Sequence, residues 1–367
     1  MLEFIEGELT AIKEAGLFRE LKTIEKISGA KVTIAGKEYL NFCSNNYLGL
    51  AGHPKVKAKA IEAINEFGFG AGASRLICGN TTIHEKLEAK LAKFKNREAA
   101  IVFTTGYMAN LGTITALVDE NDTIIIDRLN HASIIDACKL SKAKLQVYPH
   151  LDMKALENIL QKSGMYKKRL IVTDHVFSMD GDIAPLDQIA QLAKKYQAIT
   201  MIDDAHMVGK GRGAGEGIDV VMGTLSKALG SLGGFVCGSQ KLINYLRNKA
   251  RSFIYTTALP MAACAAAIAA LEVIEEGPER LKTLWENIKY FNAETPIIPI
   301  IIGDATKTME IAQKIFEQGI LVSAIRPPTV PKGQSRLRIT ISAMHSKEDL
   351  ACLASLLQPL ILTLEKP

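Results

Sequence analysis

Residues 199–206 have the sequence ITMIDDAH, an apolar run that ends in two carboxylates and a histidine. Similar short apolar runs occur at 99–105, 123–126, 145–148, 170–173 and 220–222. Helical patterns lie between them at 111–118, 153–161 and 186–196. Strand and helix alternating at this spacing predict an α/β fold, with a mostly parallel central sheet sandwiched by helices.

The pattern changes after about residue 275, where Gly277 and Pro278 interrupt the chain. Further runs at 296–302, 320–325 and 336–342 predict the strands of a smaller α+β unit. We therefore expect a large domain and a small C-terminal domain, with an N-terminal segment that packs on the small one. The expected bounds are 1–45 for the segment, 46–275 for the large domain and 276–367 for the small domain.

Composition narrows the class of protein. The 367 residues are 48% hydrophobic and carry 44 Lys and Arg against 39 Asp and Glu, a net charge of +5. The basic residues are dispersed, so we expect no nucleic-acid partner. The longest uncharged apolar stretch, 258–271, is too short for a membrane span, contains Pro260 and predicts a buried helix. Six widely spaced cysteines and a start unlike a signal peptide indicate the cytoplasm.

Lys227 follows an apolar strand, in the run GTLSKALG at 223–230. A lysine in this position can be a desolvated amine that forms a Schiff base. Its small neighbours would let a planar cofactor approach the backbone. A solvated lysine in a glycine-rich loop would have the same sequence, so both interpretations stay open at this point.

Asp203, Asp204 and His206 follow a predicted central strand, at the edge where open α/β sheets bind their ligands. Adjacent strand residues face opposite ways, so only one of the two carboxylates can point into a given pocket. A carboxylate there could hold a protonated ring nitrogen, or the stretch could be a polar loop. Asp and His without further ligands at a fixed spacing make a metal site the weaker alternative.

Two other strand ends carry candidate groups. Gly106 and Tyr107 lie where an apolar run ends and a helix begins, and the exposed N–H groups of a helix start can bind an anion. An ordinary strand-to-helix turn would show the same pattern. His131 follows the next strand, where its ring could stack on an aromatic ring or serve as a hydrogen-bonded structural histidine.

The order and spacing of these segments resemble the α-oxoamine synthases, pyridoxal-phosphate enzymes of the aspartate aminotransferase fold. The resemblance runs from about residue 17 to 358. It also rests on SNNYLGL at 44–50, NHAS at 130–133, VFSMDGD at 176–182, PPTVP at 327–331 and RLR at 336–338. The chain departs from the family pattern at His175, at Met207 and in a shortened loop that follows.

The resemblance implies pyridoxal phosphate as the cofactor and no metal. Lys227 would hold the cofactor as a Schiff base and then act as the base that takes a substrate proton. Asp203 would pair with the pyridine nitrogen, and His131 would stack over the ring. Further cofactor contacts would come from Gly106, Tyr107, Ser178, His206 and Thr224, and from Thr256 or Thr257 toward the phosphate of a partner subunit in a homodimer.

On the substrate side, the resemblance implies that Arg338 binds a carboxylate. Arg336 is the alternative, because the two residues share one face of a strand. Ser74 stands where glycine-specific members carry Thr, so it would leave room for the methyl group of alanine. The other matching substrate positions are Arg19, Asn46 and Thr329.

The reaction implied is a decarboxylative condensation of L-alanine with a pimeloyl thioester, carried by coenzyme A or a carrier protein, to an α-amino ketone of biotin synthesis. One alternative is a glycine C-acetyltransferase or another member of the same family. Alternatives of a different class are a non-catalytic binding module or a metal-dependent hydrolase on this fold.

Overall fold

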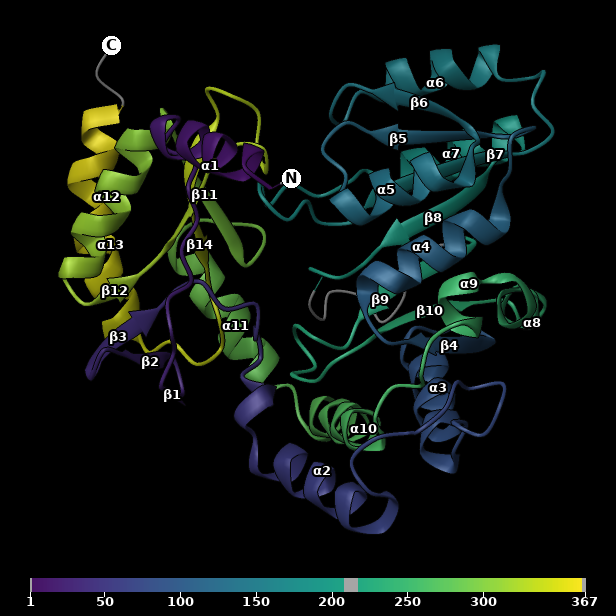
Figure 1. Ribbon diagram of the computed structural model, residues 1–367, viewed down its shortest axis with the longest axis horizontal. Coiled ribbons are helices and arrows are strands. Elements are labelled where there is room, and N and C mark those ends of the chain that lie inside the picture. The colour runs from purple at the N-terminus through teal and green to yellow at the C-terminus, as the bar shows by residue number, and fades with distance from the viewer. Residues whose placement is uncertain (1, 208–216, 365–367) are drawn as a thin grey trace. The chain divides into compact units, whose positions relative to one another are not determined.

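The computed structural model describes residues 2–207 and 217–364 (Figure 1). The shortened loop after His206 falls within 208–216 and lies outside the described residues. The chain forms two compact units. The larger unit is 50–178 with 182–281, and the smaller one is 1–49 with 179–181 and 282–367.

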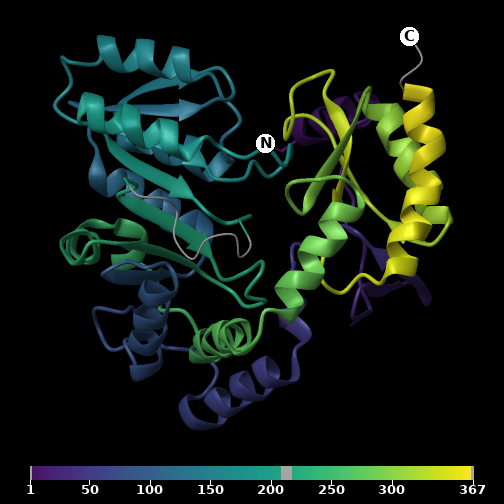
Figure 2. The ribbon, with the colours of Figure 1, turned by 180° about the vertical axis from the view of Figure 1, so that it is seen from behind.

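A seven-stranded sheet forms the centre of the larger unit, as both views of the ribbon show (Figures 1 and 2). The strand order is β4-β10-β9-β8-β7-β5-β6, and every neighbouring pair is parallel except the two pairs of β10. The prediction of a mostly parallel α/β sheet is therefore confirmed. The bounds are β4 Ala99–Phe103, β5 Thr123–Asp127, β6 Lys144–Tyr148, β7 Arg169–Asp174, β8 Ile199–Asp203, β9 Val220–Thr224 and β10 Gly234–Gly238.

The antiparallel strand β10 is absent from the sequence prediction. Its five residues begin and end with glycine, a residue type depleted in strands. The packing explains the glycine at its start, because a Cβ on Gly234 would lie 2.5 Å from the carbonyl oxygen of Thr105. Glycine therefore lets β10 approach the point where β4 turns into the next helix.

Helices cover both faces of this sheet because its strand residues alternate. Ile124 and Ile126 of β5 belong to one apolar cluster with side chains of α4 and α5, whereas Ile125 belongs to another with side chains of α6 and α7. The bounds are α2 Pro54–Phe67, α3 Thr82–Phe94, α4 Gly106–Leu117, α5 Ala132–Ser141, α6 Met153–Lys162, α7 Leu186–Tyr196, α8 Gln240–Lys249, α9 Arg251–Ile254 and α10 Met261–Glu276, with a 3₁₀ turn η1 at Leu50–Gly52.

The alanine-rich stretch forms α10, whose N-cap is Pro260. Seven of its residues are buried, from Met261 to Leu271, so the prediction of a buried helix there is confirmed. Small alanine side chains let neighbouring helices pack closely against it. In the part of the chain that the structure describes, no helix combines the length and apolar character that crossing a membrane requires.

Two small sheets form the smaller unit. One has the order β1-β2-β3-β12 and the other has the order β11-β14-β13. The run at 320–325 therefore contains two short strands, because the chain leaves one sheet and enters the other at Val322. The bounds are β1 Lys26–Ser28, β2 Lys31–Ile34, β3 Lys37–Asn41, β11 Ile297–Gly303, β12 Ile320–Leu321, β13 Ser323–Ile325, β14 Ser335–Thr340, α1 Phe4–Glu14, α11 Glu279–Tyr290, α12 Ala305–Glu317 and α13 Lys347–Leu364.

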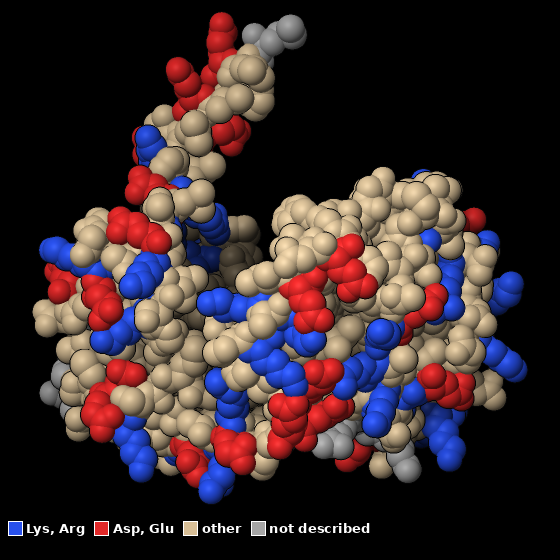
Figure 3. Space-filling model, turned by 90° about the horizontal axis from the view of Figure 1, so that it is seen from below, with Lys and Arg blue, Asp and Glu red and all other residues tan. Residues whose placement is uncertain are grey.

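Charges of both signs are distributed over the surface. On the face that Figure 3 shows, Lys and Arg side chains are interspersed with Asp and Glu side chains, without a continuous basic stripe. A nucleic-acid site would need such a stripe or patch. This face therefore carries no electrostatic footprint of a nucleic-acid site.

His150 lies between two carboxylates of the larger unit. Its Nδ1 is 3.0 Å from Asp127 Oδ1, and its Nε2 is 2.9 Å from Asp182 Oδ2. Burial opposes a positive charge on the ring, but the hydrogen bonds with Asp127 and Asp182 outweigh it and raise the pKa of His150. The protonated ring therefore stabilises the fold.

We expect this stabilisation to depend on pH. Because the folded pKa is raised, the contribution is complete below the unfolded pKa of about 6.5 and is lost as pH rises through the folded pKa. Below the unfolded pKa, the free energy of unfolding of the wild type should exceed that of His150→Gln by roughly 1–3 kcal/mol. This difference should shrink toward alkaline pH. Denaturant unfolding of both proteins measures this. A difference that stays constant with pH would contradict the role of the charge.

Candidate functional site

The carboxyl ends of three adjacent parallel strands of the larger unit carry the polar groups. β7 ends at Asp174, β8 at Asp203 and β9 at Thr224. The sheet therefore brings together side chains that lie 50 residues apart in the sequence. Ligands of open α/β sheets bind outside this edge.

Asp203 is buried and hydrogen-bonded through both oxygens. Its Oδ2 accepts a hydrogen bond from Asn110 Nδ2 at 2.8 Å, and its Oδ1 accepts one from the backbone N–H of Ala205 at 3.0 Å. These bonds orient the carboxylate. A carboxylate held in this way is suited to keep a proton on a ring nitrogen.

Asp204 has different partners. Its carboxylate forms an ion pair with the buried amine of Lys95, which follows α3, and lies 2.6 Å from Nδ1 of His175. Burial disfavours the charge, but Lys95 and His175 hold the pKa of Asp204 below its usual range. The departure at His175 therefore has a structural reason, since its ring binds the second carboxylate.

Lys227 lies in the turn that follows β9, with its Nζ 2.7 Å from Nε2 of His206. The turn is packed against η1, because a Cβ on Gly230 would lie 2.2 Å from the backbone nitrogen of Ala51. Gly230 also has a φ of +60°, a conformation that favours glycine. Close packing at Gly230 thus fixes the backbone three residues after the amine.

His131 is the N-cap of α5, and its backbone N–H donates to Asp174 Oδ2 at 2.8 Å. Burial lowers the pKa of the His131 ring, against the opposing charge of Asp203. Burial and the charge of Asp203 raise the pKa of Asp174 well above its usual range. The charge of Lys227 also acts on both groups, so the four side chains share one electrostatic environment.

The helix start at Gly106 and Tyr107 forms an anion-binding geometry. Thr105 caps α4 by accepting a hydrogen bond from the N–H of Met108 at 3.1 Å. A Cβ on Gly106 would lie 3.0 Å from Met222 Cε and 3.7 Å from Thr224 Oγ1, so glycine keeps this helix start close to Thr224. Backbone N–H groups beside a hydroxyl are suited to a phosphate.

These residues fit pyridoxal phosphate. The larger unit offers an amine for the aldehyde, an oriented carboxylate for the ring nitrogen and a glycine-opened helix start for the phosphate. The residues that would make these contacts lie at or shortly after the carboxyl ends of strands of the central sheet, namely Gly106, His131, Asp203, His206, Thr224 and Lys227. Ser178 is half-buried and is the last residue of the larger unit before the chain enters the smaller unit at 179–181.

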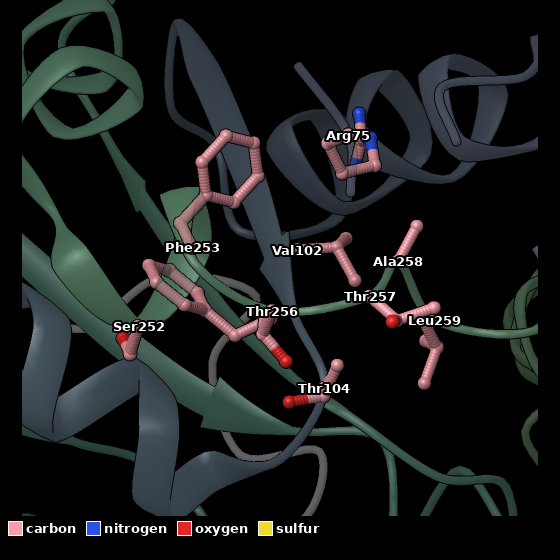
Figure 4. A pocket seen from close by; sticks show the side chains of 10 residues that line it. Arg75, Val102, Thr104, Ser252, Phe253, Thr256, Thr257, Ala258 and Leu259 are labelled. Atoms are coloured by element: carbon pink, nitrogen blue, oxygen red, sulfur yellow. The ribbon is translucent and has the colours of Figure 1, made fainter. Parts of the chain in front are cut away.

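Thr256 and Thr257 lie elsewhere in the larger unit. They follow α9 and line a small pocket with Arg75 and Thr104 (Figure 4). None of the other predicted cofactor residues lines this pocket. Ser74 is half-buried in a nearby turn, where its carbonyl oxygen accepts the N–H of Gly79 at 2.9 Å.

The two candidate arginines have different partners in the smaller unit. Arg336 forms an ion pair with Asp180 and donates to the carbonyl oxygen of Met179 at 3.3 Å. Arg338 donates to Thr340 Oγ1 at 2.9 Å and to Asn45 Oδ1 at 3.2 Å. The charge of Arg336 is thus balanced by the carboxylate of Asp180.

Three other predicted substrate residues belong to the smaller unit. Arg19 donates from Nη2 to the carbonyl oxygen of Pro327 at 3.2 Å, which brings it to the turn that contains the exposed Thr329. Asn46 is half-buried, and its N–H donates to Ser44 Oγ at 3.2 Å.

Sequence reasoning missed three buried residues beside the predicted ones, namely Asn110, Ser133 and Asp174. A signal existed for Asn110, since it lies four residues after Gly106 and therefore on the same face of α4. Ser133 follows His131 by two residues within the NHAS segment. Asp174 directly follows the predicted strand 170–173, and in the structure it pairs with Asp203 at the end of the neighbouring strand.

The structure offers little for the metal alternative. Asp203 and Asp204 are held by separate sets of partners, and no group of three or more His, Cys, Asp or Glu within 2–207 and 217–364 could hold a metal ion.

Known proteins resemble this chain over nearly its full length. The family described as aminotransferase class I and II matches residues 37–357. The 8-amino-7-oxononanoate synthase of Thermoanaerobacter pseudethanolicus is 49% identical over 372 residues, covering 95% of this chain and 94% of that protein. A protein of the same name from Citrifermentans bemidjiense is 49% identical and covers 96% of each chain.

Solved structures agree with these relatives. A serine palmitoyltransferase from S. paucimobilis, solved with pyridoxal phosphate and myriocin, has a TM-score of 0.91 and 29% identity, covering 99% of this chain and 98% of that chain. An 8-amino-7-oxononanoate synthase from Francisella tularensis has a TM-score of 0.75 and 30% identity, covering 89% and 98%.

We expect the buried ion pair of Lys95 with Asp204 to be essential for stability. Lys95→Met leaves a buried carboxylate without its cation and should lower the free energy of unfolding by about 3–5 kcal/mol. Lys93→Met, at an exposed position of α3, is the matched control and should change it by less than about 0.5 kcal/mol. Urea unfolding measures both. Equal stability of the two variants would contradict this account of Asp204.

Proposed function

This chain belongs to the aminotransferase class I and II family, in its α-oxoamine synthase branch, and we propose that the buried group around Asp203 and Lys227 is its pyridoxal-phosphate site. The protein carries out the pyridoxal-phosphate-dependent condensation that forms 8-amino-7-oxononanoate in biotin biosynthesis. The observation that carries the assignment of the site is the amine of Lys227 beside His206 at the same sheet edge as the oriented carboxylate of Asp203.

The carbon skeleton of the product identifies the substrates. A nonanoate with an amine on C8 and a ketone on C7 has a methyl group as C9. C8 and C9 correspond to Cα and Cβ of alanine, and the other seven carbons correspond to a pimeloyl group. The carboxyl group of alanine leaves as carbon dioxide, and the thiol of the acyl donor leaves when the new carbon–carbon bond forms.

Residues of this chain hold or accept the protons that the reaction moves. When bound, pyridoxal phosphate supplies an electron sink for the negative charge that develops on Cα of the amino acid. Asp203 holds a proton on the ring nitrogen, and Asn110 keeps that carboxylate in place. Lys227 would hold the aldehyde of the cofactor through Nζ, and its free amine would take the Cα proton. His206 lies within hydrogen-bond distance of the amine and orients it.

Other residues bind the cofactor and the substrate. The backbone N–H groups of Gly106 and Tyr107 and the hydroxyl of Thr224 bind the phosphate, and the glycine at 106 supports this role by leaving the helix start open. His131 would cover the ring of the cofactor, and Ser178 would contact the side of its phenolic oxygen. Arg338 binds the substrate carboxylate, for which the planar fork of a guanidinium is suited.

The remaining assignments extend this proposal. Arg19, Asn46 and Thr329 contact the acyl substrate or the product. The protein is a homodimer in which Thr256 or Thr257 reaches the partner's phosphate, and its acyl donor is pimeloyl-coenzyme A or a pimeloyl carrier protein. It works in the cytoplasm, which its six free cysteines support. We place the cofactor domain at about 46–275 and the small domain at about 276–367, with 1–45 packing on the small one. The compact units 50–178 with 182–281 and 1–49 with 179–181 and 282–367 support this division, with slightly different bounds.

Replacing the amine tests the cofactor site. Lys227→Ala should fold normally and lose at least about 10³-fold in turnover, because it removes both the covalent link and the base. Absorbance and borohydride reduction should show a covalently attached cofactor in the wild type and none in the variant. Lys241→Ala, at an exposed position of α8, is the control and should retain both properties. Near-normal turnover of Lys227→Ala would refute the assignment.

A second prediction concerns the amino acid. Ser74→Thr adds one methyl group where we place the side chain of alanine, and should lower kcat/KM for alanine by about 10- to 200-fold relative to glycine. Assays pair alanine or glycine with pimeloyl or acetyl thioesters. A wild-type preference for glycine and an acetyl thioester would favour a glycine C-acetyltransferase instead.

A further inference from the structure

Two buried polar side chains lie beside the candidate site, Asn110 next to Asp203 and Ser133 next to His131. Asn110 on α4 is fully buried and Ser133 on α5 is 1% exposed. Burying an amide and a hydroxyl costs free energy unless hydrogen bonds replace water. Their partners therefore indicate what they do.

Asn110 connects two groups of the site. Its Nδ2 lies 2.8 Å from Asp203 Oδ2 and 2.9 Å from Ser133 Oγ. The carboxylate can only accept, so the amide must present its NH₂ group on this side. The two N–H bonds of that group then point to the two oxygens, and Oδ1 has no hydrogen-bond partner among the described residues.

Ser133 continues the chain of hydrogen bonds to His131. Its Oγ lies 2.8 Å from Nδ1 of the ring, and its backbone N–H donates to the same nitrogen at 3.3 Å. A backbone N–H can only donate, so Nδ1 must accept. Because the hydroxyl oxygen already accepts from Asn110, its own hydrogen is available to Nδ1.

The capping of α5 sets the protonation state of the ring. His131 satisfies an N–H at the start of that helix, which needs an unprotonated Nδ1. Burial also lowers the pKa of His131, so the neutral ring predominates at neutral pH. A neutral ring whose Nδ1 accepts carries its proton on Nε2.

We propose that Asn110 and Ser133 are positioning residues that couple the Asp203 carboxylate to His131, orienting the carboxylate and fixing the ring as the Nε2-protonated tautomer. We call this chain of hydrogen bonds, from Asp203 through Asn110 and Ser133 to His131, the relay. Its relevance to catalysis rests on the proposed function, whereas the directions of its hydrogen bonds are independent of that function. Asn110 and Ser133 lie 23 residues apart on two helices, so the relay also joins α4 to α5.

Nitrogen NMR of the full chain with ¹⁵N-labelled histidine tests the relay, both without cofactor and loaded with pyridoxal phosphate. The wild type should show His131 as the Nε2-protonated tautomer. Ser133→Ala removes one donor to Nδ1, so the Nδ1-protonated form should gain population. The pKa of His131 should rise, because fewer hydrogen bonds favour the neutral ring.

Two variants act as controls. Ser133→Thr keeps the hydroxyl and should restore the wild-type tautomer and titration. Ser141→Ala removes another buried hydroxyl of α5, one that donates to the carbonyl oxygen of Cys138 at 2.7 Å, and should leave the His131 signals unchanged. A merely structural effect of Ser133→Ala would lower stability in the way that Ser141→Ala does, without moving the tautomer.

Asn110→Leu tests the other half of the relay. It keeps the number of side-chain heavy atoms and removes both donors, and should lower kcat by about 10- to 100-fold with a small change in KM. The absorbance titration of the loaded protein with pH should shift as well. A kcat within about twofold of wild type would overturn the role of Asn110.

These outcomes separate the relay from the proposed function. An unchanged His131 tautomer and titration in Ser133→Ala would overturn the relay, even if Lys227→Ala behaves as expected. Failure of Lys227→Ala, with the tautomer shift observed, would overturn the function and leave the relay. If Asn110→Leu does not fold, the Ser133 series decides.

Discussion

The burial of two adjacent carboxylates at the end of β8 is the constraint on which the rest of the site depends. A buried charge costs several kcal/mol unless protein groups replace its water. Lys95 and His175 stabilise the buried charge of Asp204. The carboxylate of Asp203 instead accepts hydrogen bonds from Asn110 and from the N–H of Ala205. One carboxylate thereby anchors the turn, and the other remains a hydrogen-bond acceptor directed toward α4.

Two histidines of the larger unit show how environment separates the roles of one residue type. Burial dominates at His131 and lowers its pKa, so its ring is a neutral cap of α5. Two carboxylates outweigh burial at His150 and raise its pKa, so its surroundings favour the charged ring, which links β5 to Asp182. The first suits the ring that we propose to contact the cofactor, and the second suits a structural cross-link.

His175, the position at which we expect a departure from the family pattern, is one of the two partners of the Asp204 carboxylate. The ring adds a second partner to a carboxylate that Lys95 already neutralises. It lies on the Asp204 side and makes no hydrogen bond to Asp203 through its side chain in the described part of the chain. The substitution therefore changes the support of the turn and leaves the partners of Asp203 in place.

The sequence by itself determined the alternation of strands and helices and the edge at which the polar groups lie, and it offered Lys227, Asp203 and His131 as candidates at that edge. These features are local, since each depends on neighbouring residues and on the period of a strand or helix. Only the tertiary structure decided that β10 runs antiparallel, that Arg336 pairs with Asp180 and that Asn110 joins Asp203 to Ser133. Such contacts join residues far apart in the chain, and their partners are chosen by how whole elements pack, which no local pattern encodes.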